Sequence, residues 1–571
     1  MFFHALATDY DGTIAEDGGV PDTTIAALAR LRETGRKLIL VTGRELPDLK
    51  RVFSRLDLFD KAVLENGALL YTPQTEEERP LGPPPPPEFV QRLRHRGVER
   101  LSVGRTIVAT WEPYQSSVLE TIREFGLELE IIFNKGAVMV LPTGINKASG
   151  LDAALAELGL SPLNVLGTGD AENDHAFLRV CGLSAAMANA VPSLKETADL
   201  VTKAPRGAGM EELIERLVSD ESSLGISKRH RIVVGTDDED EDVEIDPRDV
   251  VLIAGSSGIG KSTLVTALTE KLVELGFQFC VFDPEGDYDE LEDAVTVGSA
   301  ESAPSKAEIV ELVRNPRTNV VVNTLSLEMR ERPDFFAGLN PDLLSLRSRT
   351  GRPHWVIMDE AHHLLPAAHD GAPLTLPQKP TGMVLVTVHP EAISREALAH
   401  VSVVLGLGPE AGKVLEALSE SLGEEPPRIP DPPDDEHVLY WRRFTDRAPK
   451  QVKALHPRQV HKRHTRKYAE GVLDEERSFY FRGPDNALNI RAHNLIIFLQ
   501  IAEGLDDATW EHHLRLHDYS KWFRGRIQDD ALADEAEAIE SDTSLSPHES
   551  RERIAQIVRR RYTGPVSERV R

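Results

Sequence analysis

Short apolar runs recur along most of the chain, and segments with helical periodicity fall between them. Amphipathic segments such as Asp22–Thr34, Lys147–Leu158 and Ser262–Leu275 place apolar residues three and four positions apart, which predicts helices. The apolar runs are rich in Val, Ile, Leu and Phe, which predicts strands at Ala5–Thr8, Lys37–Val41, Ala62–Leu64, Asn164–Gly167, Val250–Ala254, Phe279–Phe282, Val320–Asn323, Trp355–Met358 and Val384–Val388. Such alternation is typical of parallel α/β sheets, which bind ligands at the carboxyl ends of their strands.

Three breaks in composition divide this pattern. The proline run Pro83–Pro87 is stiff and indicates a hinge into an inserted subdomain. Eight of the ten residues from Asp237 to Asp246 are acidic, which favours a solvated linker or hairpin tip. The segment Glu424–Asp435 is rich in Pro, Asp and Glu and predicts a domain boundary. The expected domains are 1–218, with a cap at about 83–140, then 226–425, and finally a basic linker and small domain at 436–571.

Composition narrows the class of protein. The 571 residues suffice for about three or four domains. With 40% hydrophobic and 28% charged residues, the chain is typical of soluble globular proteins. The two cysteines, Cys181 and Cys280, exclude a disulfide framework, and no Cys/His cluster has zinc-ligand spacing. We expect a cytoplasmic protein with no membrane partner, because no apolar run has the length of a transmembrane helix or signal peptide.

Charge is distributed unevenly along the chain. The net charge of −28 argues against indiscriminate binding of nucleic acid. The segment Trp441–Lys467 nevertheless carries ten Lys or Arg residues against one acidic residue. It either contacts nucleic acid or another polyanion, or docks on the acidic remainder of the chain, and the second interpretation is favoured.

Paired carboxylates follow the first predicted strand. Asp9 and Asp11 lie in Asp9-Tyr10-Asp11-Gly12-Thr13, where the glycine allows a tight turn. Further polar motifs follow later, as Val41-Thr42-Gly43-Arg44, Asn146-Lys147-Ala148 and Gly169-Asp170-Ala171-Glu172-Asn173-Asp174. Each alone fits a turn, a helix cap or a solvated charge. Together they indicate phosphoester chemistry, in which a divalent cation and a fixed ammonium offset the charge of the phosphate.

In the order of these motifs the chain resembles the haloacid dehalogenase superfamily of phosphatases. The resemblance implies that Asp9 is the nucleophile and forms an aspartyl-phosphate, and that Asp11 is the general acid and base. It also implies that the phosphoryl group is held by Thr42, Gly43 and Lys147. The implied Mg²⁺ ligands are Asp9, the main-chain carbonyl of Asp11, and Asp170, with Asp174 in support.

A long insert separates Thr42 from Lys147. It includes a βαβ-like stretch from Phe89 to Leu141, which is enough for a cap. With Glu65-Asn66-Gly67-Ala68 before the insert, the arrangement resembles the Cof-type branch of the superfamily. That resemblance implies a Rossmann-like core with an inserted α+β cap, and a small sugar phosphate or related metabolite as the substrate.

A complete Walker A motif follows the strand Val250–Ala254. Main-chain N–H groups of such a loop cradle phosphates, Lys261 reaches the β- and γ-oxygens, and Ser262 binds Mg²⁺. The predicted ATP-binding residues are Gly255, Ser256, Ser257, Gly258, Ile259, Gly260, Lys261, Ser262 and Thr263. After the strand Trp355–Met358, Asp359 is expected to hold Mg²⁺ through water and Glu360 to polarise the attacking water. This pairing favours ATP hydrolysis over transfer to an organic acceptor.

The same region resembles the HerA and FtsK group of hexameric translocating ATPases. The resemblance rests on Phe282-Asp283-Pro284-Glu285-Gly286-Asp287-Tyr288, Asp359-Glu360-Ala361-His362-His363-Leu364-Leu365-Pro366 and Thr387-Val388-His389-Pro390. It implies a RecA-like fold and a hexamer. Superfamily 2 helicases also contain the sequence Asp-Glu-Ala-His. They have two RecA-like units, however, and this chain has one, so we do not favour that interpretation.

Several features of this region depart from the family or stay open. His389 stands where that family commonly has Gln, and the acidic segment Ile226–Val250 replaces its N-terminal β-barrel. Arg347, Arg349 and Arg395 are candidate arginine fingers, although surface ion pairs are the favoured interpretation of each.

The C-terminal third offers little chemistry. Ser478–Glu540 resembles a small uncharacterised domain, expected to be mainly helical, with a Phe-Tyr-Phe-Arg strand and a helix from His513 to Arg524. His493, His517 and Asp518 loosely resemble an HD-type metal hydrolase, but a partly buried structural histidine is the favoured interpretation.

The sequence thus predicts a bifunctional enzyme, a Mg²⁺-dependent phosphomonoesterase joined to an ATP-hydrolysing HerA-like ATPase. Expected partners are a small phosphorylated metabolite or nucleotide, ATP, DNA as a candidate, and further copies of the chain in a hexamer. One alternative is an end-processing enzyme similar to polynucleotide kinase/phosphatases, although Glu360, the cap and the lack of an arginine-rich lid oppose it. Another is an assembly protein acting in defence against foreign DNA.

Overall fold

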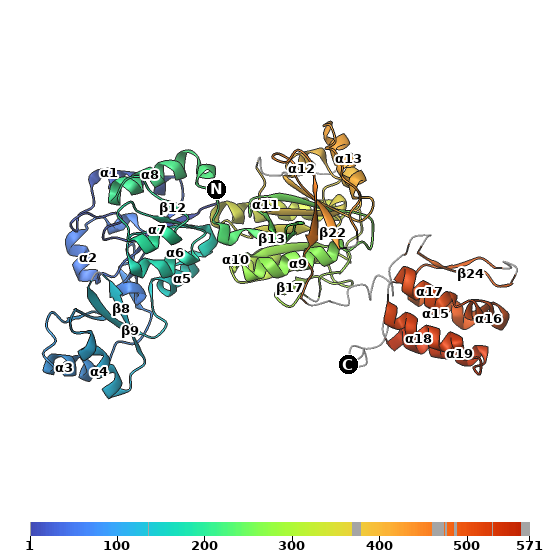
Figure 1. Cartoon of the computed structure of the whole chain (residues 1–571), viewed down its shortest axis with the longest axis horizontal. Helices are drawn as coiled ribbons and strands as arrows, with labels where there is room; N and C mark the ends of the chain where they lie inside the picture. Colours follow the sequence, from blue (N-terminus) through green and yellow to red (C-terminus); the bar gives the residue numbers. More distant parts are fainter. Residues whose placement is uncertain are drawn as a thin grey trace. The chain divides into compact units, whose positions relative to one another are not determined.

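The computed structural model describes residues 2–134, 136–289, 291–367, 379–434, 436–458, 473, 477–484, 488–527 and 529–560. The chain forms two compact units (Figure 1). The larger comprises Met1–Phe282 and Leu291–Pro457, and the smaller Asp283–Glu290 and Arg458–Arg571. Within the described residues, every helix is too short or too polar to span a bilayer.

The first sheet of the larger unit has the strand order β12-β11-β10-β1-β2-β3-β4-β5. Strands β12 to β3 run parallel, and β4 and β5 add antiparallel to the edge. The bounds are β1 Ala5–Thr8, β2 Lys37–Val41, β3 Lys61–Leu64, β4 Leu69–Thr72, β5 Glu77–Pro80, β10 Val165–Gly169, β11 Leu183–Ala186 and β12 Leu200–Val201.

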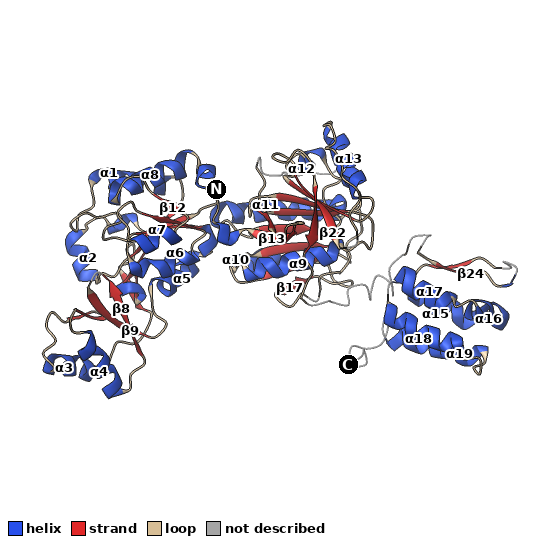
Figure 2. Ribbon diagram, in the orientation of Figure 1, coloured by secondary structure: helices blue, strands red, loops and turns tan. Residues whose placement is uncertain are grey.

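Helices cover both faces of this sheet (Figure 2), because successive residues of a strand point to opposite sides. Leu6 of β1 packs in one core cluster, whereas its neighbours Ala5 and Ala7 pack in another. The first cluster includes α1 (Asp22–Glu33), α2 (Leu46–Val52) and α8 (Arg206–Ser219). The second includes α5 (Lys147–Leu158), α6 (His175–Val180) and α7 (Pro192–Thr197). Short 3₁₀ helices lie in the connections, at η1 Leu56–Leu58, η2 Glu65–Gly67, η3 Pro162–Asn164 and η4 Glu172–Asp174.

The cap is inserted after β5 and has its own sheet and core. Its elements are α3 (Pro87–His95), β6 (Ser102–Val103), β7 (Val108–Trp111), α4 (Gln115–Phe125), β8 (Leu129–Asn134) and β9 (Ala137–Pro142). The strand order is β6-β7-β9-β8 and every pairing is antiparallel. Because β7 and β8 both run antiparallel to β9, they are parallel to each other, and α4 joins them, so the predicted βαβ-like stretch is present with β9 between its two strands. The links from β6 to β7 and from β8 to β9 are short turns, whereas α4 forms the longer crossover that the parallel strands β7 and β8 need. The proline run ends in the first turn of α3, where a missing N–H costs nothing.

The second sheet of the larger unit has the order β14-β13-β23-β22-β21-β15-β20-β19-β16-β18-β17. The bounds are β13 Ile232–Thr236, β14 Asp242–Ile245, β15 Val250–Ala254, β16 Phe279–Asp283, β17 Ala294–Val297, β18 Asn319–Asn323, β19 Trp355–Met358, β20 Met383–Thr387, β21 Val403–Leu407, β22 His437–Arg442 and β23 Lys450–Ala454. The associated helices are α9 Lys261–Glu274, α10 Lys306–Arg314, α11 Arg332–Thr350, α12 Arg395–Leu398 and α13 Ala411–Leu422, with 3₁₀ turns η7 Ala361–His363 and η8 Pro390–Ala392.

This sheet extends past the predicted boundary between residues 425 and 436. Strands β22 and β23 pair antiparallel with β21 and with each other, so the Pro- and acid-rich segment is a loop inside one sheet. The first half of the acidic run, residues 237–241, forms the tip of the β13–β14 hairpin, and the next four residues form β14. The hairpin interpretation of this run is therefore confirmed. Lys450 pairs with Asp237 at that tip (2.9 Å), and Arg442 pairs with Asp249 (3.0 Å). The described part of the basic segment therefore docks on acidic residues of the same sheet, while its residues 459–467 lie outside the described residues.

Buried hydrogen bonds connect the two α/β regions within the larger unit. His354, just before β19, accepts the Gln278 main-chain N–H at Nδ1 (2.8 Å), so its Nε2–H donates to Asn164 Oδ1 (3.0 Å). Arg352 donates to the Gly159 carbonyl (2.5 Å) and to Gln278 Oε1 (3.0 Å). Burial holds the pKa of His354 well below its usual range, so the ring is neutral at this contact.

The smaller unit is mainly helical and has an aromatic core. Its elements are β24 (Phe479–Phe481), β25 (Ile490–Ala492), α15 (Leu495–Gly504), α16 (Asp507–Arg515), α17 (Asp518–Trp522), a π-helical turn (Phe523–Ile527), α18 (Asp530–Ser541) and α19 (Pro547–Val558). Phe479, Phe498, Trp510 and Tyr519 pack together in this core. The single helix predicted from His513 to Arg524 is wrong, since His517 has a φ of +55° and separates α16 from α17.

The turn after β3 gives a test of backbone packing. Gly67 has a φ of +109°, and a Cβ there would lie 2.0 Å from the Asn146 carbonyl oxygen. We expect Gly67→Ala to destabilise the chain by at least about 3 kcal/mol, because strain and overlap with the main chain add. Gly97→Ala is the matched control, since Gly97 has a φ of +75° but open space at its Cβ, and only roughly 1 kcal/mol is expected there. Thermal unfolding of the full chain checks this, and equal shifts in the two variants would contradict it.

Candidate active sites

Parallel strand ends bring the first group of predicted residues to one edge of the first sheet. Strands β10, β1, β2 and β3 are successive neighbours, with Thr168 opposite Thr8 and Leu40 opposite Thr8 on the other side. Asp9 directly follows β1, Thr42 follows β2, and Asp170 follows β10. The carboxyl ends of the strands therefore place these residues around one position.

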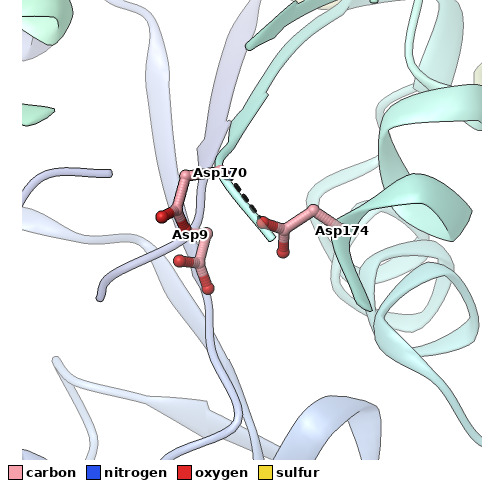
Figure 3. Close-up of side chains that lie close together, drawn as sticks. All are labelled: Asp9, Asp170 and Asp174. Atoms are coloured by element: carbon pink, nitrogen blue, oxygen red, sulfur yellow. Dashed lines mark hydrogen bonds between the residues drawn. The ribbon is translucent and has the colours of Figure 1, made fainter. Parts of the chain in front are cut away.

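Three carboxylates cluster at that edge. Asp9, Asp170 and Asp174 each have an oxygen within 4.8 Å of the others, and all three side chains are buried. In Figure 3 the side chains of Asp9 and Asp170 lie side by side, and Asp174 reaches toward them from the following turn. Main-chain N–H groups of Asp170 (2.8 Å) and Ala171 (2.9 Å) donate to Asp174 Oδ2, which fixes this side chain.

Lys147 is the cation of this cluster. Its Nζ lies 2.6 Å from Asp9 Oδ1 and 2.6 Å from Asp174 Oδ1. The lysine is the first residue of α5, which Asn146 caps by accepting from the N–H groups of Ala148 and Ser149. Burial lowers the pKa of Lys147, but Asp174 and Asp9 together raise it above its ordinary value. The ammonium therefore keeps its charge inside the protein.

The cluster fits a divalent cation by its charge and its donor atoms. Burial and the neighbouring Asp174 raise the pKa of Asp9 to about 7, although Lys147 opposes the shift. Three carboxylates against one ammonium leave an excess of negative charge in a buried place, which is costly without a counter-ion. Oxygen donors are those that Mg²⁺ prefers. Gly12 leaves room for the Asp170 carboxylate, because a Cβ at this position would lie 2.2 Å from Asp170 Oδ2.

Asp11 lies apart from the three clustered carboxylates. Its side chain is 47% exposed and forms a bidentate ion pair with Arg44, in which each carboxylate oxygen lies 2.7 Å from a guanidinium nitrogen. Arg44 also donates to Asp48 Oδ2 (2.5 Å). The sequence motif contained Arg44, but sequence reasoning gave it no role. Thr42 is buried, and its hydroxyl oxygen accepts the N–H of Arg44 (3.2 Å), which fixes the turn through Gly43.

Asn189 is a site residue that sequence reasoning missed. Its Nδ2 donates to the Gly12 carbonyl (2.8 Å) and to Asp170 Oδ2 (3.3 Å). Asn189 lies in the loop after β11, outside the four motifs. A single asparagine in a loop carries no spacing signal, so only the fold could identify it.

The second group of predicted residues lies around the P-loop at the end of β15. Gly258 and Gly260 have φ values of +78° and +103°, which the tight loop before α9 requires. Lys261 Nζ donates to the carbonyls of Gly255 (3.0 Å) and Ser256 (3.1 Å), so the ammonium lies on the loop itself. The remaining predicted ATP-binding residues, Ser257, Ile259, Ser262 and Thr263, belong to the same loop and first turn of α9.

Asp359 and Glu360 follow β19, which is separated from the P-loop strand β15 by β20. Asp359 is buried, and its N–H donates to the Phe282 carbonyl (3.0 Å). Glu360 adopts a left-handed φ of +42°, an uncommon conformation for this residue type. His362 lies between Glu360 Oε2 (3.4 Å) and Thr387 Oγ1 (3.0 Å). The structure thus places His362 beside Glu360, and His362 is itself hydrogen-bonded to a hydroxyl of the neighbouring strand β20.

The remaining polar candidates lie in structural contacts. Arg347 donates to the carbonyls of His354 and Thr381, Arg395 to that of Leu422, and Arg349 to that of Ser345. In the smaller unit, Asp518 pairs with His513 (2.8 Å) rather than with His493 or His517. Among the described residues, the Asp9 cluster is the one group of acidic, His or Cys side chains close enough to share a metal. The HD-type pattern therefore gains no support.

Comparison with known proteins identifies the first region. A sequence profile of haloacid dehalogenase-like hydrolases matches residues 6–98 and 114–214. Phosphoglycolate phosphatase 2 of Saccharolobus solfataricus is 31% identical over 231 residues, which cover 38% of this chain and 92% of that protein. A phosphoglycolate phosphatase of Methanothermobacter thermautotrophicus is 30% identical over 223 residues, covering 38% of this chain and 98% of that one. The chain belongs to the haloacid dehalogenase-like hydrolases, as its motifs predicted.

A second profile, that of the central domain of the helicase HerA, matches residues 232–349. It covers the P-loop and confirms the HerA-like resemblance. Among solved structures, a haloacid dehalogenase-family phosphatase from Bacteroides thetaiotaomicron aligns at 19% identity and a TM-score of 0.32, covering 38% of this chain and 94% of that one. A haloacid dehalogenase-like hydrolase from B. subtilis aligns at 15% identity and a TM-score of 0.31, covering 38% and 100%.

The raised pKa of Asp9 predicts how cation binding depends on pH. Asp9 has a folded pKa of about 7 against an ordinary value of 3.8, so the folded state binds more protons between these values. The free energy of unfolding of the metal-free chain therefore falls as pH rises through this window. Mg²⁺ competes with that proton, and we expect it to raise the unfolding temperature more at pH 8 than at pH 5. Asp9→Asn should remove most of this difference, and equal stabilisation of the wild type at both pH values would refute the site.

Proposed function

We propose that the chain is a bifunctional enzyme, a Mg²⁺-dependent phosphomonoesterase in residues 1–218 and an ATP-hydrolysing HerA-like ATPase that begins at residue 226. The observation that carries the phosphatase is the buried Asp9–Lys147–Asp174 arrangement, with both contacts at 2.6 Å, beside Asp170. It provides a nucleophilic carboxylate, a fixed ammonium and oxygen ligands for one cation. Membership of the haloacid dehalogenase-like hydrolases supports the same assignment.

The phosphatase reaction proceeds in two displacements. An Asp9 carboxylate oxygen attacks phosphorus, the bond to the alkoxide breaks, and Asp11, released from its ion pair with Arg44 and protonated, donates a proton to the leaving oxygen. Asp11 then takes a proton from water, which attacks the aspartyl-phosphate and releases phosphate and the Asp9 carboxylate. Lys147 and the turn at Thr42 and Gly43 hold the phosphoryl oxygens. A bound Mg²⁺, held by Asp9, the Asp11 carbonyl and Asp170 with support from Asp174, supplies positive charge to the phosphoryl group.

The substrate class is a small phosphorylated metabolite or nucleotide. The cap packs against Ala68 and Ile145 of the core. This contact supports a substrate of limited size. Two relatives that align over 92% and 98% of their lengths are named phosphoglycolate phosphatases, which makes 2-phosphoglycolate the first compound to test.

The ATPase proposal rests on the P-loop and on the pairing of Asp359 with Glu360. The position of β20 between β15 and β19 supports a RecA-like arrangement, in which Glu360 polarises water against ATP held by residues 255–263. In this proposal Ser262 and Asp359 bind the Mg²⁺ that accompanies the nucleotide. We propose that nucleotide state gates the phosphatase, because Asn164, just before β10, bonds to His354, just before β19 (3.0 Å).

Loss of one activity at a time tests the two sites. We expect Asp9→Asn to lower hydrolysis of 2-phosphoglycolate and sugar phosphates by roughly 10³-fold or more while ATP hydrolysis persists. Lys261→Ala should abolish ATP hydrolysis, leave the phosphatase active in the absence of nucleotide, and abolish the change in the phosphatase rate when ATP is added. Phosphate release with each substrate measures both rates. Each variant is the control of the other, and loss of both activities in either one would contradict two separate sites.

DNA association and hexamer formation are proposed from the HerA-like region. We expect ATP hydrolysis to rise with duplex or single-stranded DNA, and this stimulation to fall steeply with salt if phosphate contacts carry the binding. The ion pairs of Lys450 and Arg442 with Asp237 and Asp249 oppose a role for those two side chains in DNA binding. Steady-state ATPase rates across a salt series check the expectation. Appreciable basal hydrolysis without stimulation would instead favour an ATP-gated metabolite phosphatase.

A further inference from the structure

One carboxylate of the phosphatase core binds the main chain of the cap. Glu65 follows β3, and its side chain is buried. It accepts the N–H groups of Arg105 (2.8 Å), Thr106 (2.8 Å) and Ile107 (3.1 Å), three consecutive residues of the turn between β6 and β7. We call residues 104–107 the cap turn. Consecutive N–H groups that converge on one anion form an anion nest, so core and cap are joined by charge-assisted hydrogen bonds.

The cap turn approaches Glu65 closely. A Cβ at Gly104 would lie 2.7 Å from Glu65 Oε1, so the approach requires a glycine at this position. The Arg105 guanidinium is directed to Glu78 (2.9 Å) at the surface. The contact with Glu65 therefore uses the main chain of the cap turn and not the charge of Arg105.

The backbone around Glu65 touches the candidate active site directly. The N–H of Glu65 donates to the Arg44 carbonyl (3.0 Å), and that of Asn66 donates to the Thr42 carbonyl (3.1 Å). The side chain of Asn66 accepts from Asn173 (2.9 Å), which lies between the two aspartates of the last motif. The residues that hold the cap turn are thus bonded to both loops that surround Asp9.

A small apolar contact accompanies these hydrogen bonds. Ile107 and Met139 of the cap pack with Ala68 of the core. The Met139 sulfur would lie 3.8 Å from a Cβ at Gly43. We call residues 42–44, which hold the phosphoryl group in the proposed mechanism, the phosphate-binding turn. Strand β8 of the cap also contacts η4, which carries Asp174. The cap therefore contacts the core at Gly43 and at η4 as well as at Glu65.

The backbone conformation of this turn is unusual for its residues. Glu65 and Asn66 have φ values of +51° and +56°, and Gly67 follows at +109°. Glutamate rarely adopts the left-handed region, and such conformations persist where the surrounding contacts fix them. Here they direct the Glu65 carboxylate toward the cap while the N–H groups of Glu65 and Asn66 face the turn at residues 42–44.

We propose that Glu65 is a positioning residue that ties the cap turn to the phosphate-binding turn and so limits the size of the phosphomonoester. The inference rests on the proposed phosphatase function. A cap held against the site excludes water and bulky leaving groups and admits small ones. Release of the cap turn would relax this limit without altering Asp9, Lys147 or Asp170.

The test uses the full chain with Glu65→Gln, and Glu78→Gln as the matched control. An amide cannot accept with both terminal atoms, so we expect amide hydrogen exchange of residues 105–107 to rise about tenfold in Glu65→Gln. Glu78→Gln, which breaks an exposed ion pair to the same cap turn, should leave that exchange unchanged. Unchanged exchange in a folded Glu65→Gln protein would overturn the proposal. This readout needs no enzymatic activity, so it stands apart from the test of the phosphatase itself.

Kinetics provide the second readout. We expect kcat/KM for p-nitrophenyl phosphate relative to that for 2-phosphoglycolate to rise several-fold in Glu65→Gln, mainly through KM, and to be restored toward wild type in Glu65→Asp. If Glu65→Gln does not fold, Thr106→Pro removes one donor and leaves Glu65 intact, and Thr106→Val is its control. An unchanged substrate ratio and unchanged exchange in Thr106→Pro would equally refute the role.

Discussion

The first active site depends on one buried ion triad, in which Lys147 bridges Asp9 and Asp174. Its Nζ lies 2.6 Å from an oxygen of each. Buried charges are stable only when they are paired, because water no longer solvates them. Asp170 adds a further carboxylate and leaves the cluster short of positive charge. This deficit suits the site to a divalent cation, and it requires strands β1 and β10 to be neighbours with their ends in register.

The two large sheets place their candidate catalytic groups at the same kind of position. In each, a carboxylate follows the carboxyl end of a strand, Asp170 after β10 and Asp359 after β19. The residues just before these two strands, Asn164 and His354, are hydrogen-bonded to each other. Each strand therefore has a candidate catalytic group at one end and a contact between the regions at the other.

The sequence predicted most local structure, because apolar periodicity is a local property. The strands expected at Ala5–Thr8 and Lys37–Val41 have those bounds, and the helix expected at Lys147–Leu158 does as well. The order in which strands pair was harder to predict from the sequence. A loop rich in Pro, Asp and Glu has the same composition whether it lies between two strands of one sheet or between two domains. The predicted boundary at residue 425 was therefore misplaced. The βαβ-like stretch of the cap was predicted, but the position of β9 between its two strands was not, because the choice of pairing partner leaves no mark on local composition.

The sequence by itself determined which chemistry to propose for each candidate site, since the motifs of Asp9, Lys147, Asp170 and Lys261 are recognised by residue type and order. Only the tertiary structure decided which groups complete them. Arg44 binds Asp11, Asn189 binds Asp170, and Glu65 binds three main-chain N–H groups of the cap. These partners are distant in sequence, and a main-chain N–H group is common to nearly all residue types, so the sequence does not mark it. Folding alone brings such groups within hydrogen-bonding distance, so no pattern along the chain could have revealed them.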